Sequence, residues 1–532
     1  MNSGDDVTQV FVADVVYTFH NGKAERLPRA VVMRGDRIER FADPELRHER
    51  REWSDLMVND FRGHVLVPGF FDAHNHQPTT ARDVGQVRTS LAQSVGDLLL
   101  ALGEEAARRP AGEWITTEHA LTVSQLGRRG LPSAAELDTV TPNHPTAVRF
   151  GAHTMVLNSL ALKETNMAPP GTDPPYGVVD RDPATGDALG PIREYGAIRL
   201  VLDRLRKRTP DSDVSAMRLT QLEYARAGVT SVRVPGLRPG DLSVYQSLVR
   251  SDGKLGMRVF GGPRVDPTHP HADKLAMIRS WETTTGFGSK WLRLDAVKIF
   301  VDGGFETSLH GQTHLFLGGN ELDDLVTCAV DRGWSVACHA VSSEAVDLTL
   351  DAYEKVASSM AGGLRLAIEH GFFATPKQLE RAASIGVWLS TQPGVGYMDS
   401  ELIRDRLPAE AVSQAFPLAT ALGKGVLCAL GSDWNATPGS LQRPFSPLQT
   451  LRTAVTRMGA DGLALAEDEA VAVEKAFYLH TRAPAELVGV DDLGGLWSGA
   501  RGDLVALDAD PLQGLAEAEV SAVVVGGSLL PG

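Results

Sequence analysis

The sequence at residues 65–77, VLVPGFFDAHNHQ, joins an apolar run to two histidines separated by one residue. The apolar run predicts a β-strand that begins at residue 65. Alternate side chains of an extended strand share a face, so His74 and His76 are expected to point the same way. Two imidazoles on one face can bind one cation. By itself, however, a His-x-His pair is a weak indication of a metal site.

The composition is that of an ordinary globular protein. The chain has 532 residues, of which 43% are hydrophobic and 22% charged. This length indicates two or three domains, or one large barrel with an appended domain. The net charge of -15 argues against a nucleic-acid or anionic-membrane partner, because both would be repelled by most of the surface.

Features of secretion and membrane insertion are missing from the sequence. The opening residues, MNSGDD, have no basic segment followed by an apolar one, and no later apolar run is long enough to cross a bilayer. We therefore expect a cytoplasmic protein. Three cysteines are an odd number and do not suggest a disulfide framework.

Both ends of the chain have short β-strand patterns divided by turn residues. Residues 8–18 are strand-like, and Asn21-Gly22 is a hairpin turn signal because both positions of such a turn need positive φ. Chain termini commonly lie close together, so we expect residues 1–64 and 441–532 to form one composite β-sandwich domain. Part of residues 441–490 is expected to be helical and to pack on the middle of the chain. The other strand patterns are at residues 30–33, 37–41, 503–507 and 521–525.

The middle of the chain, residues 65–440, alternates between strand-like and helix-like stretches, which predicts an α/β fold with a parallel sheet. Eight strands are predicted, the number that closes a (β/α)8 TIM-like barrel, whose reactive groups lie at the C-terminal ends of the strands. Helices are expected at residues 211–227, 344–356 and 376–384. Besides the strand at residue 65, the strands are expected at residues 229–234, 255–259, 292–301, 335–339, 364–370, 386–392 and 426–433.

A long insertion interrupts this alternation after the first barrel strand. Residues 78–211 include a helix-like stretch at 94–107 and a segment rich in proline and glycine at 168–176. A connection of this length must have its own structure and usually carries function. We expect it to form a cap over the mouth of the barrel.

Six residues with metal-binding chemistry lie at or near the predicted strand ends, where they would converge on the mouth of the barrel. Imidazole nitrogen and carboxylate oxygen are ligands of Zn²⁺, and a mixed set also accepts Mn²⁺, Fe²⁺ or Co²⁺. An ammonium group has no lone pair, so the one lysine is useful only if burial deprotonates it and it reacts with CO₂ to give a bridging carbamate. The six are His74, His76, Lys298, His339, His370 and Asp433.

The motifs around these residues resemble those of the amidohydrolase superfamily, and within it the amidohydrolase family 3 branch of YtcJ-like metal-dependent hydrolases. The resemblance covers nearly the whole chain, which makes it more specific than any single motif. The similar motifs are VPGFFDAHNH at 67–76, FGAHTMVLNSLAL at 150–162, RDPATG at 181–186, VKIFVDG at 297–303, IEH at 368–370, STQP at 390–393, LGSD at 430–433 and GARGDLVALD at 499–508.

The resemblance implies two divalent metals, with Zn²⁺ expected, and assigns each ligand a place. One metal would be held by His74, His76 and Asp433. The second would be held by His339 and His370, with carboxylated Lys298 bridging the two. A site with one metal, in which Lys298 only forms a hydrogen bond, is the alternative. The sequence departs from the commoner family forms at VSSE, residues 341–344, and at WNATP, residues 434–438, which face the substrate.

The predicted reaction is hydrolysis of a non-peptide C–N bond in a small molecule: an amide, an N-substituted formamide, a cyclic amide or an imide. Metals lower the pKa of water, and Asp433 is placed to take its proton and return it to the leaving nitrogen. His153 in the cap and Trp434 are candidate substrate contacts. By location alone, Glu118, His119 and Tyr397 are possible pocket residues.

Two other functions stay open at the level of sequence. A deaminase with one metal would release ammonia from an amidine-like ring and would need a separate proton-donating carboxylate, for which Glu344 is the nearest candidate. A non-catalytic barrel would be expected to have lost ligands, whereas all six are present. A homodimer is expected only because it is the commonest assembly.

Overall fold

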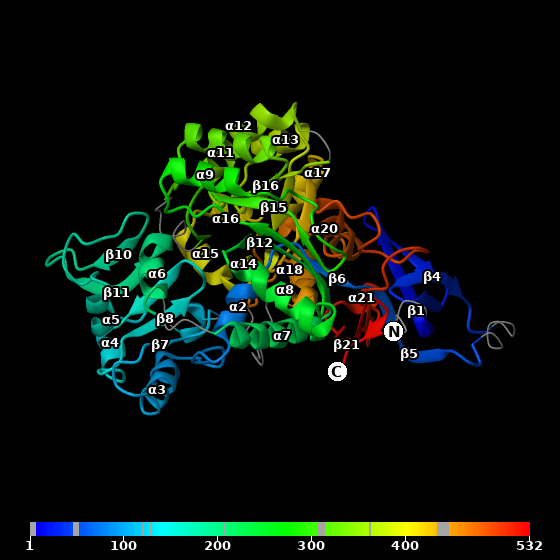
Figure 1. Ribbon diagram of the computed structural model, residues 1–532, viewed down its shortest axis with the longest axis horizontal. Coiled ribbons are helices and arrows are strands. Elements are labelled where there is room, and N and C mark those ends of the chain that lie inside the picture. The colour runs from blue at the N-terminus through cyan, green and yellow to red at the C-terminus, as the bar shows by residue number, and fades with distance from the viewer. Residues whose placement is uncertain are drawn as a thin grey trace.

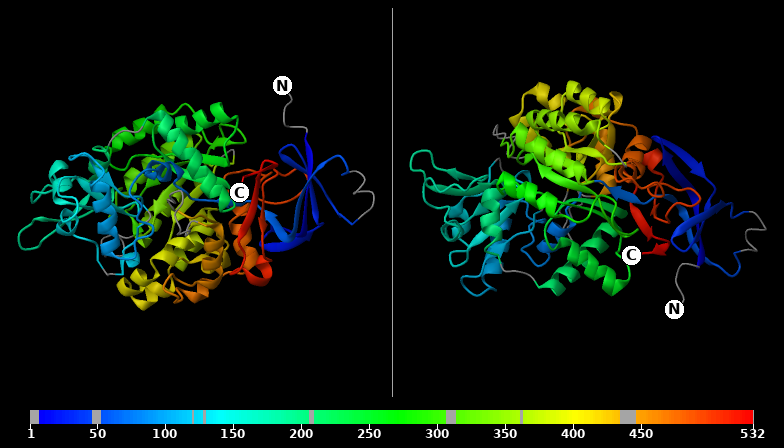
Figure 2. Two further views of the ribbon diagram at one scale, coloured as in Figure 1. Left: turned by 90° about the horizontal axis from the view of Figure 1, so that it is seen from below. Right: turned by 45° about the horizontal axis from the view of Figure 1, so that its top comes forward.

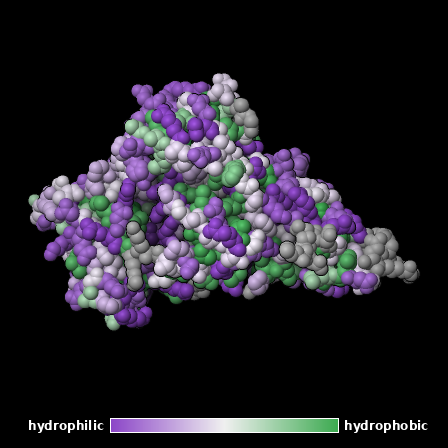
Figure 3. All heavy atoms as spheres, in the orientation of Figure 1, coloured by the Kyte–Doolittle hydropathy of each residue, from purple (hydrophilic) through white to green (hydrophobic). Residues whose placement is uncertain are grey.

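The computed structural model describes residues 7–45, 53–119, 121–127, 130–205, 209–305, 314–360, 363–433 and 446–531. Along its longest axis lie a small α/β part, a central α/β part and a β-sheet (Figure 1). Hydrophilic residues cover much of the face seen in Figure 3, and hydrophobic residues gather in its central region. No helix within these ranges is long and apolar enough to cross a membrane.

One mixed sheet of eight strands contains both ends of the described chain. Figure 2 shows the C-terminal strands, in red, beside the N-terminal strands, in blue. Strand β20 runs antiparallel to β5, with Val505 opposite Val67. Asn21 and Gly22 have positive φ and join the first hairpin, as predicted. The strands are β1 Thr8–His20, β2 Lys23–Leu27, β3 Ala30–Arg34, β4 Arg37–Ala42, β5 Met57–Pro68, β20 Leu504–Leu507, β21 Val520–Val525 and β22 Ser528–Leu529.

Two parallel sheets make up the central part, in the orders β14-β13-β12-β6 and β15-β16-β17-β18-β19. Backbone hydrogen bonds connect them in two places. After β13, Val265 N donates to Lys298 O over 2.9 Å, and after β6, Ala73 N donates to Leu430 O over 3.1 Å. The predicted α/β class is confirmed. The strands are β6 Phe70–Asp72, β12 Val229–Leu237, β13 Arg258–Pro263, β14 Leu292–Leu294, β15 Ala296–Phe300, β16 Ser335–Ala340, β17 Leu366–His370, β18 Trp388–Thr391 and β19 Leu427–Leu430.

Helices follow the parallel strands and lie outside them (Figure 1). Helix α13 keeps its predicted bounds because Thr375 and Gln378 form a capping box and Pro376 occupies the first turn. The helices are α2 Gln77–Asp83, α7 Pro210–Arg226, α8 Asp241–Asp252, α9 His271–Ser280, α11 Gly319–Asp331, α12 Ser343–Ala357, α13 Pro376–Ser384, α14 Pro393–Met398, α15 Ser400–Arg406, α16 Ala409–Ser413, α17 Leu418–Gly423, α18 Pro447–Thr456, η3 Glu467–Glu469, α19 Val473–Leu479, α20 Arg482–Leu487 and α21 Pro511–Gly514.

The strand predicted from residue 65 is divided between two sheets. Strand β5 ends at Pro68 in the mixed sheet, beyond the boundary expected at residue 64, and β6 begins at Phe70 in a parallel sheet. The division falls at Gly69, where a Cβ would lie 2.3 Å from the hydroxyl oxygen of Thr230. Only glycine lets the backbone pass this close between the sheets.

The strand predicted at residues 292–301 is also divided. β14 pairs with β13, whereas β15 pairs with β16, and Asp295 lies between them. The buried Asp295 side chain forms an ion pair with Arg233. The break therefore lies at a buried carboxylate that pairs with a residue of β12.

The insertion forms a separate five-stranded sheet, β10-β11-β9-β8-β7, at the end of the molecule opposite the mixed sheet (Figure 1). We call residues 84–205 the cap, because α2 and α7 pack together through Ala81 and Met217 and so belong to the central part. Its elements are α3 Val95–Ala106, β7 Ile115–Thr116, η2 Ser124–Leu126, α4 Ala134–Asp138, β8 Thr146–Phe150, β9 Thr154–Leu157, α5 Ser159–Glu164, β10 Val178–Arg181, β11 Ala188–Arg193 and α6 Glu194–Leu202.

Candidate metal centre

The two histidines of the opening motif lie beyond the end of β6, not on the strand. His76 is the residue before α2, so the expectation that strand alternation orients the pair is wrong. Backbone hydrogen bonds position them instead: His74 N donates to the Asp72 carboxylate over 3.2 Å, and Asp433 N donates to His74 O over 2.8 Å. Both rings still face Asp433, and ligand atoms of these three residues lie within 4.8 Å of one another.

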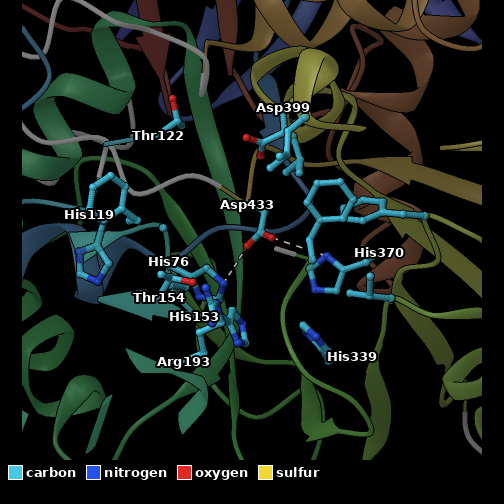
Figure 4. Close-up of a pocket in the computed structure, with 18 of the residues that line it drawn as sticks. His76, His119, Thr122, His153, Thr154, Arg193, His339, His370, Asp399 and Asp433 are labelled. Atoms are coloured by element: carbon cyan, nitrogen blue, oxygen red, sulfur yellow. Dashed lines mark ion pairs between the residues drawn. The ribbon is translucent and has the colours of Figure 1, made fainter. Parts of the chain in front are cut away.

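Asp433 lies at the centre of the cluster (Figure 4). Its Oδ1 is 2.9 Å from His76 Nε2 and 3.5 Å from His74 Nε2, and its Oδ2 is 3.6 Å from His370 Nδ1. Asp433 and His370 both have positive φ, of 53° and 79°. Non-glycine residues in this conformation are strained and concentrate at functional sites, which fits two predicted ligands held in fixed positions.

All six predicted ligands line one cavity. The rings of His339 and His370 are 4.4 Å apart between centroids. Lys298, near the middle of β15, is 1% exposed, and its Nζ has no hydrogen-bond partner among the described residues. The buried Nε2 of His74 likewise forms no hydrogen bond. A buried polar group without a hydrogen bond is costly. A metal bound to His74 Nε2, and conversion of the Lys298 amine into a carbamate, would remove this cost.

Burial sets the charge of several of these predicted ligands. It lowers the pKa of His74 to about 4 and that of His370 to about 3, so both rings are neutral and have a lone pair to donate. Burial also lowers the pKa of Lys298 to about 8, which raises the fraction of reactive free amine. Burial would raise the pKa of Asp433, but His74, His76 and His370 outweigh it and hold that pKa well below its usual range. The donor set fits a divalent metal.

A buried chain of charged groups stands behind His74. The Glu369 carboxylate lies 2.5 Å from His74 Nδ1 and forms an ion pair with Arg233, whose Nε is 2.5 Å from Asp295 Oδ2. With Nδ1 bound to Glu369, the ring presents Nε2 to the site. The pKa of Glu369, which burial would raise, is held well below its usual range by Arg233 and His74.

The cap contributes a second histidine–carboxylate pair. His153 lies between β8 and β9, and its Nδ1 is 3.0 Å from Oε2 of the fully buried Glu194. The other Glu194 oxygen accepts a hydrogen bond of 3.0 Å from Gly304 N, in the loop after β15. The rings of His153 and His339 lie 5.7 Å apart, so the cap contacts the predicted ligands directly.

The other residues that the sequence suggested for the pocket differ in whether they line the cavity. His119 lines the cavity, where its ring pairs with Asp83. Glu118 does not line it and accepts backbone hydrogen bonds from residues 89 and 90. Tyr397 is also absent from its lining. Glu344, suggested for a deaminase, is exposed in α12 and lies outside the cavity lining. Trp434 lies outside the described residues.

Sequence reasoning assigned no role to several residues that hold the site. Glu369 and Gln392 occur within the quoted motifs IEH and STQP, and Gln392 Oε1 lies 2.9 Å from His370 Nδ1. The positions of these two residues, next to a predicted ligand or in a motif of the resemblance, are the sequence signal that could have identified them. Arg233 and Glu194 lie in no quoted motif, so the sequence offered no comparable signal for them.

Comparison with known proteins identifies the family. Residues 58–530 match the model of the amidohydrolase family. The chain belongs to this family. The amidohydrolase is 28% identical to the N-substituted formamide deformylase of Arthrobacter pascens over 480 residues, which cover 86% of each chain. It is 26% identical to the putative amidohydrolase YtcJ of Bacillus subtilis (strain 168), over 96% of this chain and 92% of that protein.

Solved structures share the fold of this amidohydrolase. An uncharacterized metal-dependent hydrolase from Pyrococcus horikoshii OT3 matches with a TM-score of 0.71 and 23% identity, over 95% of this chain and 98% of its own. A second, from Pyrococcus furiosus, matches with a TM-score of 0.68 and 24% identity, over 95% and 100%. By family membership the amidohydrolase is a metal-dependent hydrolase that acts on C–N bonds of small molecules and uses a divalent metal.

Proposed function

We propose that this amidohydrolase hydrolyses a non-peptide C–N bond: an amide, an N-substituted formamide, a cyclic amide or an imide. The observation that carries the proposal is the convergence of six ligand-type residues on one cavity, with His74 Nε2 and Lys298 Nζ buried and without hydrogen bonds. The similarity to a protein named N-substituted formamide deformylase supports formamides as the first compounds to test.

The six residues support a site for two metals, with Zn²⁺ the expected ion. His74, His76 and Asp433 would hold one, and His339 and His370 the other, bridged by carboxylated Lys298. A bound divalent metal supplies Lewis acidity and lowers the pKa of water towards neutrality. The lowered pKa of the buried Lys298 favours the free amine, which is the form that reacts with CO₂.

Asp433 is the proposed proton carrier. Its pKa lies well below the usual range, so it is ionised near neutral pH and can accept a proton from the attacking water. It would then return that proton to the leaving nitrogen. His153 and Trp434 are proposed to contact the substrate; for His153, its place in the cavity lining supports this role.

We also propose that the two parallel sheets close into a (β/α)8 barrel, with the cap over its mouth and a composite β domain at one end. The described strands of that β domain form one mixed sheet and not the two sheets of the expected sandwich. The hydrogen bonds Val265 N to Lys298 O, after β13, and Ala73 N to Leu430 O, after β6, support closure. Reactive groups then lie at the C-terminal ends of the strands, where the cap can shield them from water.

The test is a screen of metal-loaded protein against formamides, acyclic amides, cyclic amides and imides. Release of formate or a carboxylate together with an amine, or ring opening, is the expected result. Release of ammonia from an amidine-like heterocycle, with no C–N hydrolysis of these compounds, would favour the deaminase instead. Glu344, the carboxylate suggested for that reaction, lies outside the cavity lining.

A further inference from the structure

Beyond its ligand cluster, the cavity has apolar walls on two sides. One wall belongs to the cap, and the other to the loops and helices that follow the parallel strands. We call the space between them the apolar chamber. The cap wall consists of Leu121, Val123, Leu131 and Phe150, and the mouth wall of Phe305, Val341, Phe372, Val395 and Leu402.

The mouth wall begins directly at the predicted ligands. The ring of Phe372 lies 5.3 Å from the ring of His370, and it packs against Phe305 at 5.4 Å and Phe416 at 4.3 Å. Val341 N donates to the buried Asp302 carboxylate over 3.0 Å. These contacts fix the wall beside the predicted ligands, where a group next to the substrate amide can pack against it.

The cap wall is anchored in the hydrophobic core of the cap. Leu121 forms a backbone bridge with Phe150, and both side chains are almost fully buried. Val123 and Leu131 are half-buried and pack against the same core. The two walls therefore come from separate hydrophobic clusters.

Charged side chains in the described lining do not favour a charged substituent. Arg193 pairs with Asp180, and the rings of His119 and His153 bind Asp83 and Glu194. Asp399 adds a carboxylate to the lining. Apart from Lys298 in the predicted ligand cluster, a substrate carboxylate would find no cation without an acidic partner in the described lining. Desolvating its charge between apolar walls would be costly.

We infer that the substrate is a neutral amide or formamide with an aryl or branched alkyl substituent, which lies in the apolar chamber while the amide faces the ligands. The inference rests on the proposed function. The two apolar walls, and not the predicted ligands, would select the substrate. Apolar walls with few placed polar groups are typical of small-molecule sites.

The test measures binding of three hydroxamates to the zinc-loaded protein by calorimetry, since a hydroxamate chelates metal without being hydrolysed as an amide. Benzohydroxamate is expected to bind about 10- to 100-fold tighter than acetohydroxamate, because its ring buries apolar surface. 4-Carboxybenzohydroxamate is expected to bind no more tightly than acetohydroxamate. Equal affinity for the first two, or tightest binding of the carboxylated compound, would overturn the inference.

Substitutions in the two walls test whether the apolar chamber causes the preference for benzohydroxamate. Val123→Asp and Leu402→Asp put a charge on each wall at half-buried positions, and each is expected to remove most of the preference for benzohydroxamate. Leu219→Asp, at a 48% exposed position on α7 outside the cavity lining, is the matched control and should keep the preference. An unchanged preference in both wall variants contradicts the assignment.

Metal content, measured on the same samples, separates this inference from the proposed function. Protein that retains metal and binds hydroxamates without preferring the phenyl compound refutes the apolar chamber alone. Protein that retains no metal and binds none of the three refutes the proposed function, and the chamber as its substrate site with it.

Discussion

At the scale of single residues, the site depends on the orientation of His74. Its Nδ1 faces Glu369, and its Nε2 faces Asp433. The carboxylate fixes which ring nitrogen is available to a metal and makes the imidazole a better donor. Glu369 is fully buried and pairs with Arg233, so its own position is fixed as well.

Glu369→Gln is therefore expected to weaken metal binding by about 10- to 100-fold. The amide can still accept a hydrogen bond from His74 but no longer has the negative charge that supports it. A competition titration with a chelating dye measures the affinity. Glu380→Gln, at an exposed position on α13 that pairs with Lys424, is the control and should bind metal as the wild type does. Equal metal affinities in the two variants would show that Glu369 does not support metal binding.

Asp433→Asn is expected to lower turnover by roughly 10²- to 10⁴-fold on a substrate identified in the screen, because the amide cannot take up the proton. Metal content should be determined on the same preparation, since Asp433 is also a predicted ligand. A variant that keeps both its metal and wild-type turnover would show that another group carries the proton.

The ligand candidates could be predicted from sequence because each ends, or lies within, an apolar strand pattern. Their supporting partners could not. Glu369 and His74 are 295 residues apart, and only the fold brings them together. Glu194 has no regular pattern around it, and its positive φ of 65° is a property that sequence spacing does not reveal.

At the scale of elements, the loop after β15 joins the cap to the ligands. Gly303 O lies 3.1 Å from His339 Nε2, and Gly304 N donates to Glu194. A Cβ at Gly304 would lie only 2.3 Å from Cγ of His153. The absence of a side chain lets the cap approach this closely.

Gly304→Ala is thus expected to displace His153 and to destabilise the protein by about 1–3 kcal/mol, as overpacked sites do. The midpoint of thermal unfolding should fall, and activity should fall with it. Gly423→Ala is the matched control, because its added Cβ meets nothing within 4 Å at the end of α17. Similar midpoints for the two variants would mean that the close contact does not constrain the cap.

The bounds of helices and strands could be predicted where neighbouring residues determine them. They could not be predicted where contacts between distant parts of the chain determine them. The capping box of Thr375 and Gln378 defines α13 in the sequence itself. Gly69 and Asp295 divide predicted strands because of Thr230 and Arg233, which are far away along the chain. The parallel order of the sheets followed from alternation, whereas the pairing of β20 with β5 depends on contacts between opposite ends of the chain.

At the scale of the whole molecule, a buried ion pair connects the central part to the mixed sheet. Arg258, at the start of β13, makes two hydrogen bonds to Asp503, before β20, of 2.6 and 3.0 Å. Its guanidinium also lies over the ring of Trp291 at 4.6 Å. Gly526 N donates to the same carboxylate over 2.7 Å. One buried carboxylate thus links the C-terminal strands to the central part.

Arg258→Met would leave Asp503 buried without its charge partner and is expected to cost about 3–5 kcal/mol, visible as a lower thermal unfolding midpoint. The exposed pair of Arg218 and Asp252 provides the control, since Arg218→Met should change the midpoint far less. The double variant Arg258→Met/Asp503→Leu should recover much of the lost stability. A midpoint unchanged by Arg258→Met would contradict this link between the two parts.

The most direct test of the metal centre is metal content per chain, measured on protein purified without chelator or affinity-column metal. We compare the wild type with Lys298→Ala and with Lys274→Ala, which removes another lysine that is almost fully buried but lies outside the cavity lining. About two metals in the wild type and in Lys274→Ala, falling to one or none in Lys298→Ala, are expected for a carbamate-bridged pair. About one metal in all three proteins would exclude Lys298 from metal binding and contradict the two-metal site.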